Sequence, residues 1–282
     1  MIEKLRNYLF DLRDRGRIAI ALARAGAMLQ ARQVDLARPG TWEFCGFSQN
    51  GEDGILQVLR SRLRAPSRDF IEVGAGDGVE NNTAWLAVAE KYSGLMVEGD
   101  AHCADRARRV MRAVNLSVEC RRLFVTRENA AGLVPRAPRN APDVLSLDID
   151  GNDYYVARAL LDAGLRPKIA VVEYNSVFGP ERRMTIEYRE GFDFKRAHET
   201  ELYYGVSLAG WRACFEGYGY RFVTVERNGA NAFFADPAQF DTGFLDGVRG
   251  LAFAESQYQL RKFGVPSEEQ FRLIASQKFV TI

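Results

Sequence analysis

The stretch FIEVGAGDG, residues 70–78, decides the fold of this chain. It opens with apolar residues that are typical of a buried parallel strand. Three glycines follow: Gly74, Gly76 and Gly78. Glycine tolerates positive φ and lets backbone N–H groups approach a ligand closely. The stretch therefore predicts a strand that runs into a nucleotide-binding turn.

A second apolar run, GLMVEG at residues 94–99, ends in a carboxylate at Glu98. This spacing from the glycines is typical of an acidic residue that binds ribose hydroxyls. A dinucleotide site would need a small residue three positions after Gly76, where Val79 stands. The pair of motifs thus favours S-adenosylmethionine over NAD as the cofactor. The alternative is that Glu98 only caps the end of a strand.

Composition excludes several classes of protein. The 282 residues are 47% hydrophobic and 27% charged with a net charge of +1, so the basic excess of a general nucleic-acid binder is missing. The four cysteines form no C-x-x-C pair, which favours a reducing, cytoplasmic location. Arg24 interrupts an apolar patch at residues 18–29 that is in any case too short to span a bilayer.

From Phe70 onward, short apolar runs alternate with helical stretches, which predicts a doubly wound α/β sheet. Two extended runs around Asn228 and Gly229 predict a terminal antiparallel hairpin. We expect three regions: an N-terminal helical arm over 1–40, a catalytic domain over 41–236 and a helical extension over 237–282. The arm is expected to serve oligomerisation or anchoring.

The richest polar cluster is LSLDIDGNDYYV, residues 145–156, in which Asp148 and Asp150 follow an apolar run. A neighbouring run, IAVVEYN, ends in Glu173 and Asn175. Strand ends face the ligand crevice of such sheets, so Asp148 is also a candidate cofactor contact. Oxygen ligands in this pattern suit Mg²⁺ or Mn²⁺, and Asp150 could then remove a substrate proton. The alternative is that these groups cap helices and hydrogen-bond the substrate without a metal.

Two further segments carry candidate residues. In FSQNGEDGIL, residues 47–56, Gln49 and Glu52 could lie over the amino-acid end of the cofactor, although a helix N-cap explains them equally. His198 falls in a segment expected to cover the substrate, where it is either a catalytic base or a surface residue.

The chain resembles class I S-adenosylmethionine-dependent methyltransferases of the FkbM-like group over residues 47–235. The resemblance rests on the ordered motifs SQNGEDGIL, FIEVGAGDGVENNT, LMVEGD, LSLDIDGNDYYV and VVEYN. It implies a Rossmann-like seven-stranded sheet and O-methylation, commonly of sugars or glycans. The implied cofactor contacts are the methionine-end residues Glu72, Gly74, Gly76 and Asn81, the ribose ligand Glu98, and Gln49 with Glu52.

The DIDGND segment is also similar to a motif of metal-dependent sugar O-methyltransferases. That likeness implies Asp148 as a metal ligand, Asp150 as the base, and Glu173 with Asn175 as further ligands. The sequence therefore predicts a methyltransferase acting on a hydroxyl of a sugar, glycan or related small molecule. Two alternatives stay open: a nucleic-acid or protein methyltransferase, and a non-catalytic methyltransferase-like binding module.

Overall fold

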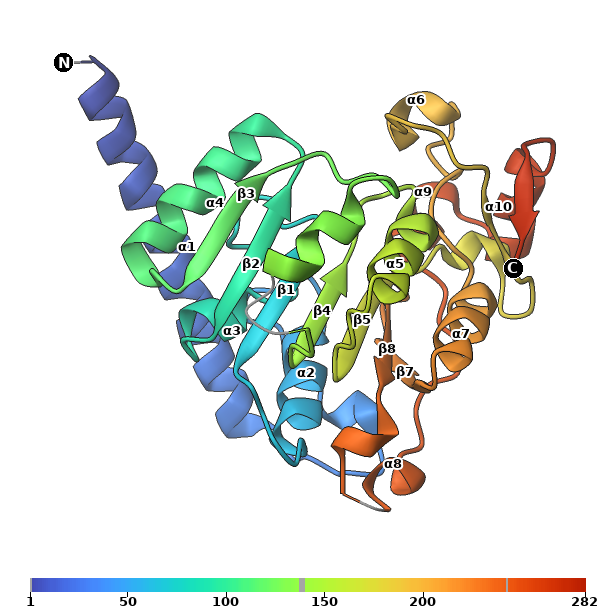
Figure 1. Ribbon diagram of the computed structural model, residues 1–282, viewed down its shortest axis with the longest axis horizontal. Coiled ribbons are helices and arrows are strands. Elements are labelled where there is room, and N and C mark those ends of the chain that lie inside the picture. Colours follow the sequence, from blue (N-terminus) through green and yellow to red (C-terminus); the bar gives the residue numbers. More distant parts are fainter. Residues whose placement is uncertain (1, 137–139, 242) are drawn as a thin grey trace.

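A computed structural model describes residues 2–136, 140–241 and 243–282 (Figure 1). Its main sheet has seven strands in the order β3-β2-β1-β4-β5-β8-β7. The strands are β1 (Asp69–Val73), β2 (Ser93–Glu98), β3 (Val118–Arg122), β4 (Val144–Leu147), β5 (Ile169–Glu173), β7 (Arg221–Val225) and β8 (Asn231–Ala235).

Strands β1 to β5 are parallel, and β8 runs antiparallel to both β5 and β7. This is the topology of the Rossmann-like methyltransferase fold, and it confirms the predicted doubly wound sheet with its terminal hairpin. The first strand is buried along all five of its residues, as the apolar start of the deciding stretch requires.

Helices cover both faces of the sheet (Figure 1). One core cluster joins the sheet to α1, α2, α3 and α4, and a second joins the opposite face to η2, α5 and α7. The bounds are α1 (Ile2–Ala31), α2 (Glu52–Ser61), α3 (Ala84–Val88), α4 (Ala101–Val114), α5 (Asp153–Asp162), α7 (Leu208–Gly217) and the 3₁₀ helices η1 (Pro39–Thr41) and η2 (Ala130–Arg136). The predicted N-terminal arm is thus one long helix.

A smaller layer lies next to the half of the sheet that contains β5, β8 and β7 (Figure 1). Strands β6 (Met184–Ile186) and β9 (Phe279–Thr281) pair antiparallel there. The remaining helices are α6 (Phe194–Ala197), α8 (Phe244–Gly247), α9 (Gln257–Phe263), α10 (Ser267–Ile274), η3 (Ser176–Phe178) and η4 (Pro237–Gln239). The C-terminal extension, expected to be helical, therefore ends in a strand. Within the described ranges, none of the helices is long and apolar enough to cross a bilayer.

Candidate active site

A cavity of about 710 Å³ opens at the carboxyl ends of β1, β2 and β4. This edge is where open α/β sheets bind ligands, and the volume suits a small-molecule cofactor with part of a substrate. Its walls come from the turn after β1, the end of β2, residues 123–125, the loop after β4 and residues 191–196. Gln49 and Glu80 complete it.

The glycine turn after β1 needs glycine for two separate reasons. Gly74 has φ +90°, and a Cβ there would lie 1.6 Å from the carbonyl oxygen of Asp148. Gly76 has φ +54° and lines the cavity with its backbone exposed to a ligand. Two of the three glycines predicted to bind the cofactor, Gly74 and Gly76, therefore lie at the cavity wall.

Glu98 lines the cavity at the end of β2. Its Oε2 accepts a hydrogen bond from the Gly76 N–H at 2.8 Å, and its Oε1 accepts one from the Asp100 N–H at 2.7 Å. Each carboxylate oxygen has a second lone pair, so both remain available to ligand hydroxyls. Glu98 is thus fixed by backbone groups on both sides.

Gly78 and Asn81 shape the turn and do not line the cavity. A Cβ at Gly78 would lie 2.9 Å from Ala107 of α4, so glycine allows this helix to pack closely. The Asn81 amide donates to the Ala75 carbonyl at 2.9 Å. Both residues hold the backbone in place behind the surface that a ligand would touch.

Glu72 is buried in β1 and also lies outside the cavity lining. Its Oε1 accepts a hydrogen bond from the Ser146 hydroxyl at 2.9 Å. Burial raises the pKa of Glu72 to about 7, although hydroxyl and amide hydrogen bonds around it act in the opposite direction. The structure therefore places this predicted cofactor contact between strands.

The two predicted residues before α2 have different surroundings. Gln49 lines the cavity, and its amide donates to Glu80 at 3.2 Å. Glu52 is buried and accepts hydrogen bonds from the Asn50 N–H and the Asn231 side chain, each at 2.9 Å. Only Gln49 is in a position to touch a cofactor in this cavity.

Asp148, Asp150 and Glu173 form an acidic group in which one oxygen of each lies within 4.8 Å of the others. Strand β4 ends at Leu147, so Asp148 and Asp150 lie in the loop that follows it. Asp150 takes a left-handed conformation in this loop, with φ +52°. A non-glycine residue held in this region stores strain, which is common at functional sites.

Electrostatics in the acidic group favour the uncharged carboxyls. Burial, reinforced by neighbouring carboxylates, raises the pKa of both Asp148 and Glu173 well above the usual range. Partial desolvation at the cavity wall and the charge of Asp153 raise the pKa of Asp150, whose side chain is still exposed, to about 6. Repulsion of this kind is relieved by a proton or a cation between the carboxylates. Three hard oxygen donors fit Mg²⁺ or Mn²⁺.

Asn175 and His198 lie outside this group. The Asn175 amide donates to the Leu202 and Tyr204 carbonyls at 2.8 and 3.0 Å, and its Oδ1 caps η3 by accepting from the Val177 N–H. Asn175 is buried and uses its polar atoms to hold the chain, so a ligand role would cost these bonds. The His198 ring pairs with Thr200 at 2.8 Å and does not line the cavity.

Residues 191–196 line the cavity and form a cover over it, beside the His198 segment that was expected to cover the substrate, although none of the six was a candidate site residue. The Phe192 ring of this cover packs closely on Gly151, which has no side chain. A Cβ at Gly151 would lie 2.5 Å from the ring. Asn152 ties the same loop to the Arg189 carbonyl at 2.7 Å. Lys195 and Arg196 bring positive charge to the cavity, and a basic pair inside an aromatic loop was the sequence signal for them.

Comparison with known proteins adds fold similarity. No protein-family model matches the chain, and no curated protein matches it either. An O-methyltransferase from Bacillus cereus in complex with SAH is 18% identical, with 78% of this chain and 89% of that chain covered at a TM-score of 0.43. The N-terminal domain of EvdMO1, determined in the presence of SAH and D-fucose, is 15% identical, with 65% and 81% covered at 0.42.

The METTL16 methyltransferase domain is 13% identical, with 64% of this chain and 63% of that chain covered at a TM-score of 0.41. Two of these three neighbours are methyltransferases by name, and the FkbM-like subgroup stays a prediction. The case for a function in this chain therefore rests on the geometry of its own cavity.

Proposed function

We propose that the protein is an S-adenosylmethionine-dependent O-methyltransferase that acts on a hydroxyl of a sugar, glycan or related small molecule. One observation carries the proposal. Gly76 and Glu98, which form a nucleoside-binding wall, line the same cavity as Asp148 and Asp150, the two aspartates of the acidic group at its other end.

The cofactor end of the cavity is assigned to the β1 and β2 side. Glu98 would accept hydrogen bonds from the ribose hydroxyls through its free lone pairs. Phe124 lines the cavity close to Gly99, where a Cβ would lie 3.1 Å from the ring. An apolar ring next to the ribose carboxylate suits the adenine base.

The substrate end is assigned to the acidic group. Bound S-adenosylmethionine supplies an activated methyl group for in-line transfer to a substrate oxygen. Asp150 would take up the hydroxyl proton, since it lines the cavity and its pKa of about 6 leaves it ionised at neutral pH. Residues 191–196 cover this end, which limits access of water and aligns the reacting oxygen.

We further propose that a divalent cation binds between one oxygen each of Asp148, Asp150 and Glu173, with the second oxygen of Asp150 left to take up the proton. The compact set of oxygen donors supports this site. Asp150 replaces Asn175, which was the third ligand predicted from the sequence. A cation there would favour ionisation of a substrate hydroxyl and relieve the carboxylate repulsion.

Isothermal titration calorimetry with S-adenosylmethionine, with and without Mg²⁺, tests the cofactor assignment. We expect binding in at least one condition, and no heat in either would refute the proposed function. A methyl-transfer screen over saccharides, RNA and protein then tests the substrate class. Labelling of RNA or protein alone would replace the O-methyltransferase assignment, and binding without turnover on any acceptor would favour a binding module.

The cation is tested by Mn²⁺ titration followed by electron paramagnetic resonance. We expect the unaltered protein to bind Mn²⁺ and Glu173→Gln to bind it at least tenfold more weakly. Arg182→Ala, which removes an ion pair with Glu268 that includes no member of the acidic group, serves as the control. Equal Mn²⁺ binding by Glu173→Gln and the unaltered protein would exclude the cation site.

A further inference from the structure

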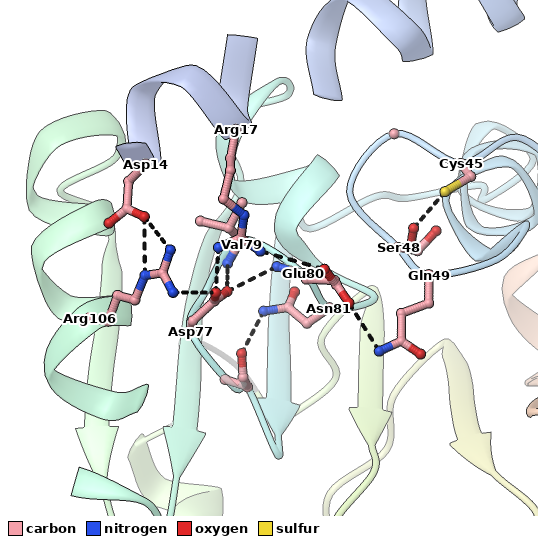
Figure 2. A network of polar contacts seen from close by, with 12 residues as sticks. Asp14, Arg17, Cys45, Ser48, Gln49, Asp77, Val79, Glu80, Asn81 and Arg106 are labelled. Atoms are coloured by element: carbon pink, nitrogen blue, oxygen red, sulfur yellow. Dashed lines mark hydrogen bonds and ion pairs between the residues drawn. The ribbon is translucent and has the colours of Figure 1, made fainter. Parts of the chain in front are cut away.

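The N-terminal helix α1 contacts the cofactor turn directly through a polar network (Figure 2). Asp77, which lies between Gly76 and Gly78, is the centre of this network. Its Oδ1 caps the turn by accepting from the Val79 N–H at 2.9 Å and the Glu80 N–H at 3.2 Å. One oxygen of Asp77 is thus used to shape the loop that lines the cavity.

The other oxygen of Asp77 is held by two arginines. Arg17 of α1 reaches Oδ2 at 2.5 Å, and Arg106 of α4 reaches it at 3.1 Å. Arg106 is itself paired with Asp14, one turn before Arg17 on α1 (Figure 2). Two residues of α1 therefore meet the turn, one directly and one through α4.

Three of these four charged side chains are largely removed from water, and Arg17 is 29% exposed. The side chains of Asp14, Arg106 and Asp77 are 9%, 12% and 16% exposed. Charge-assisted hydrogen bonds with little solvent exposure are stronger and more directional than surface ion pairs. Burial acts to raise the pKa of Asp77, but the bonds from Arg17 and the backbone outweigh it and leave this pKa below the usual value.

A second set of contacts leads from Arg17 into the cavity itself. Arg17 reaches Glu80 Oε2 at 3.5 Å, and Glu80 Oε1 accepts from the Gln49 amide at 3.2 Å (Figure 2). Gln49 and Glu80 both line the 710 Å³ cavity. The same arginine thus contacts the turn behind the cavity and a residue on its wall.

Apolar packing holds α1 farther along the helix. Ala21 and Ala25 are buried, and a Cβ at Gly46 would lie 2.9 Å from the Ala25 Cβ. Between that contact and the turn a separate cavity of about 180 Å³ remains, with Arg17 and Glu80 in its lining. Polar contacts, and not dense packing, therefore connect α1 to the cofactor turn.

We propose that α1 is a positioning element for the cofactor turn, with Arg17 as its positioning residue, so that docking of α1 and binding of the cofactor are thermodynamically linked. The inference rests on the proposed function for its ligand. Linkage is reciprocal: if docked α1 strengthens cofactor binding, bound cofactor must stabilise docked α1 by the same factor.

Calorimetric titration of the full chain with S-adenosylhomocysteine tests the first half of this linkage. We expect Arg17→Ala to raise the dissociation constant roughly five- to twentyfold, in the range typical of coupled sites. Arg17→Lys should recover part of the affinity, because an ammonium group can still pair with Asp77 but has no planar fork to reach Glu80 as well.

Arg32→Ala is the matched control. Arg32 follows α1 and donates to the Trp42 carbonyl and to Gln57, away from the turn. We expect it to lower the melting temperature without changing the dissociation constant. If Arg17→Ala and Arg32→Ala weakened binding equally, or if Arg17→Ala bound like the unaltered protein, the positioning role would be excluded.

Hydrogen exchange measures the second half of the linkage, which is the stabilisation of docked α1 by bound ligand. Addition of S-adenosylhomocysteine should slow amide exchange in residues 12–25 of the unaltered protein and leave these amides unaffected in Arg17→Ala. Unchanged exchange at saturating ligand in the unaltered protein would contradict the linkage. If the unaltered protein bound no ligand, the proposed function itself would fail. Equal binding by the unaltered protein and all variants would instead exclude only the positioning role of Arg17.

Discussion

The Gly76 N–H donates a hydrogen bond to Glu98 Oε2 over 2.8 Å, which joins the turn after β1 to the end of β2 at the cavity wall. The same carboxylate therefore has two roles in the proposed site. It would bind the ribose, and it holds the glycine turn through the Gly76 N–H.

Replacement of Glu98 by alanine should weaken cofactor binding by ~1.5 to 3 kcal/mol, because hydrogen bonds to a charged group are lost on both the ribose and the turn. This corresponds to a dissociation constant roughly ten- to a hundredfold higher by calorimetry. Glu119→Ala, an exposed carboxylate on β3, is the control and should bind normally. An unchanged constant for Glu98→Ala would remove the ribose assignment.

Replacement of Asp150 by alanine should abolish proton uptake and lower kcat about 10²- to 10⁴-fold while the cofactor dissociation constant stays within about twofold. The two quantities separate because Asp150 is assigned to the substrate end of the cavity. Methyl transfer and calorimetry on the same preparation provide the measurement. Full activity in Asp150→Ala would exclude Asp150 as the base.

Replacement of Gly74 by alanine should prevent folding or destabilise the protein by on the order of 4 kcal/mol or more, because φ is positive and the added Cβ meets the Asp148 carbonyl at 1.6 Å. Gly76→Ala should cost only about 1 to 2 kcal/mol, since its Cβ finds no atom closer than 3.9 Å. Denaturant unfolding measures both.

Gly132→Ala is the control for these glycine variants, because a Cβ there meets nothing within 4 Å and its φ is not in the left-handed region. It should unfold like the unaltered protein. If Gly74→Ala and Gly132→Ala were equally stable, the end of β1 and the loop after β4 could not lie as close together as described.

Replacement of Glu72 by glutamine should make stability less sensitive to pH. Burial raises the pKa of Glu72 to about 7 from an ordinary 4.5, so the folded state keeps a proton that the unfolded state releases between these values. The unfolding free energy of the unaltered protein therefore falls as pH rises through this window. Above pH 7 the stabilising contribution of protonated Glu72 is lost.

The glutamine variant carries no such proton and keeps an oxygen for the Ser146 hydroxyl. The difference in unfolding free energy between Glu72→Gln and the unaltered protein should grow in favour of the variant from pH 4.5 to 7, by at most ~3 kcal/mol, and then level off. Distant titrating groups cancel in this difference. A difference independent of pH would show that Glu72 is not buried as a neutral acid.

Much of the fold could be predicted from local sequence. The apolar run before Gly74 specified the first strand, and the spacing to Glu98 specified the second, because the distance between strand ends in a βαβ unit is nearly constant. The hairpin at Asn228 and Gly229 followed from turn chemistry. These features depend on neighbours in the chain, which the sequence shows directly.

The acidic group was predicted in part. Asp148, Asp150 and Glu173 were all candidates, but the sequence did not show that Asp148 and Asp150 lie in the loop beyond β4, where Asp150 has a left-handed conformation, or that Glu173 at the end of β5 lies within 4.8 Å of both. Asn175 was chosen for its residue type, and only the tertiary structure shows that it holds the backbone of residues 202–204.

A substrate-covering segment was expected around His198, but only the tertiary structure shows that residues 191–196 line the cavity in its place and that α1 contacts the cofactor turn. Arg17 and Asp77 are 60 positions apart, and no local pattern pairs one arginine with one aspartate among 37 acidic residues. Hydrophobic periodicity and glycine conformation act over a few residues, so the sequence determined the strands, the turn and the chemistry at the strand ends. The partners of charged side chains depend on how whole elements pack, and that is settled only when the chain is folded.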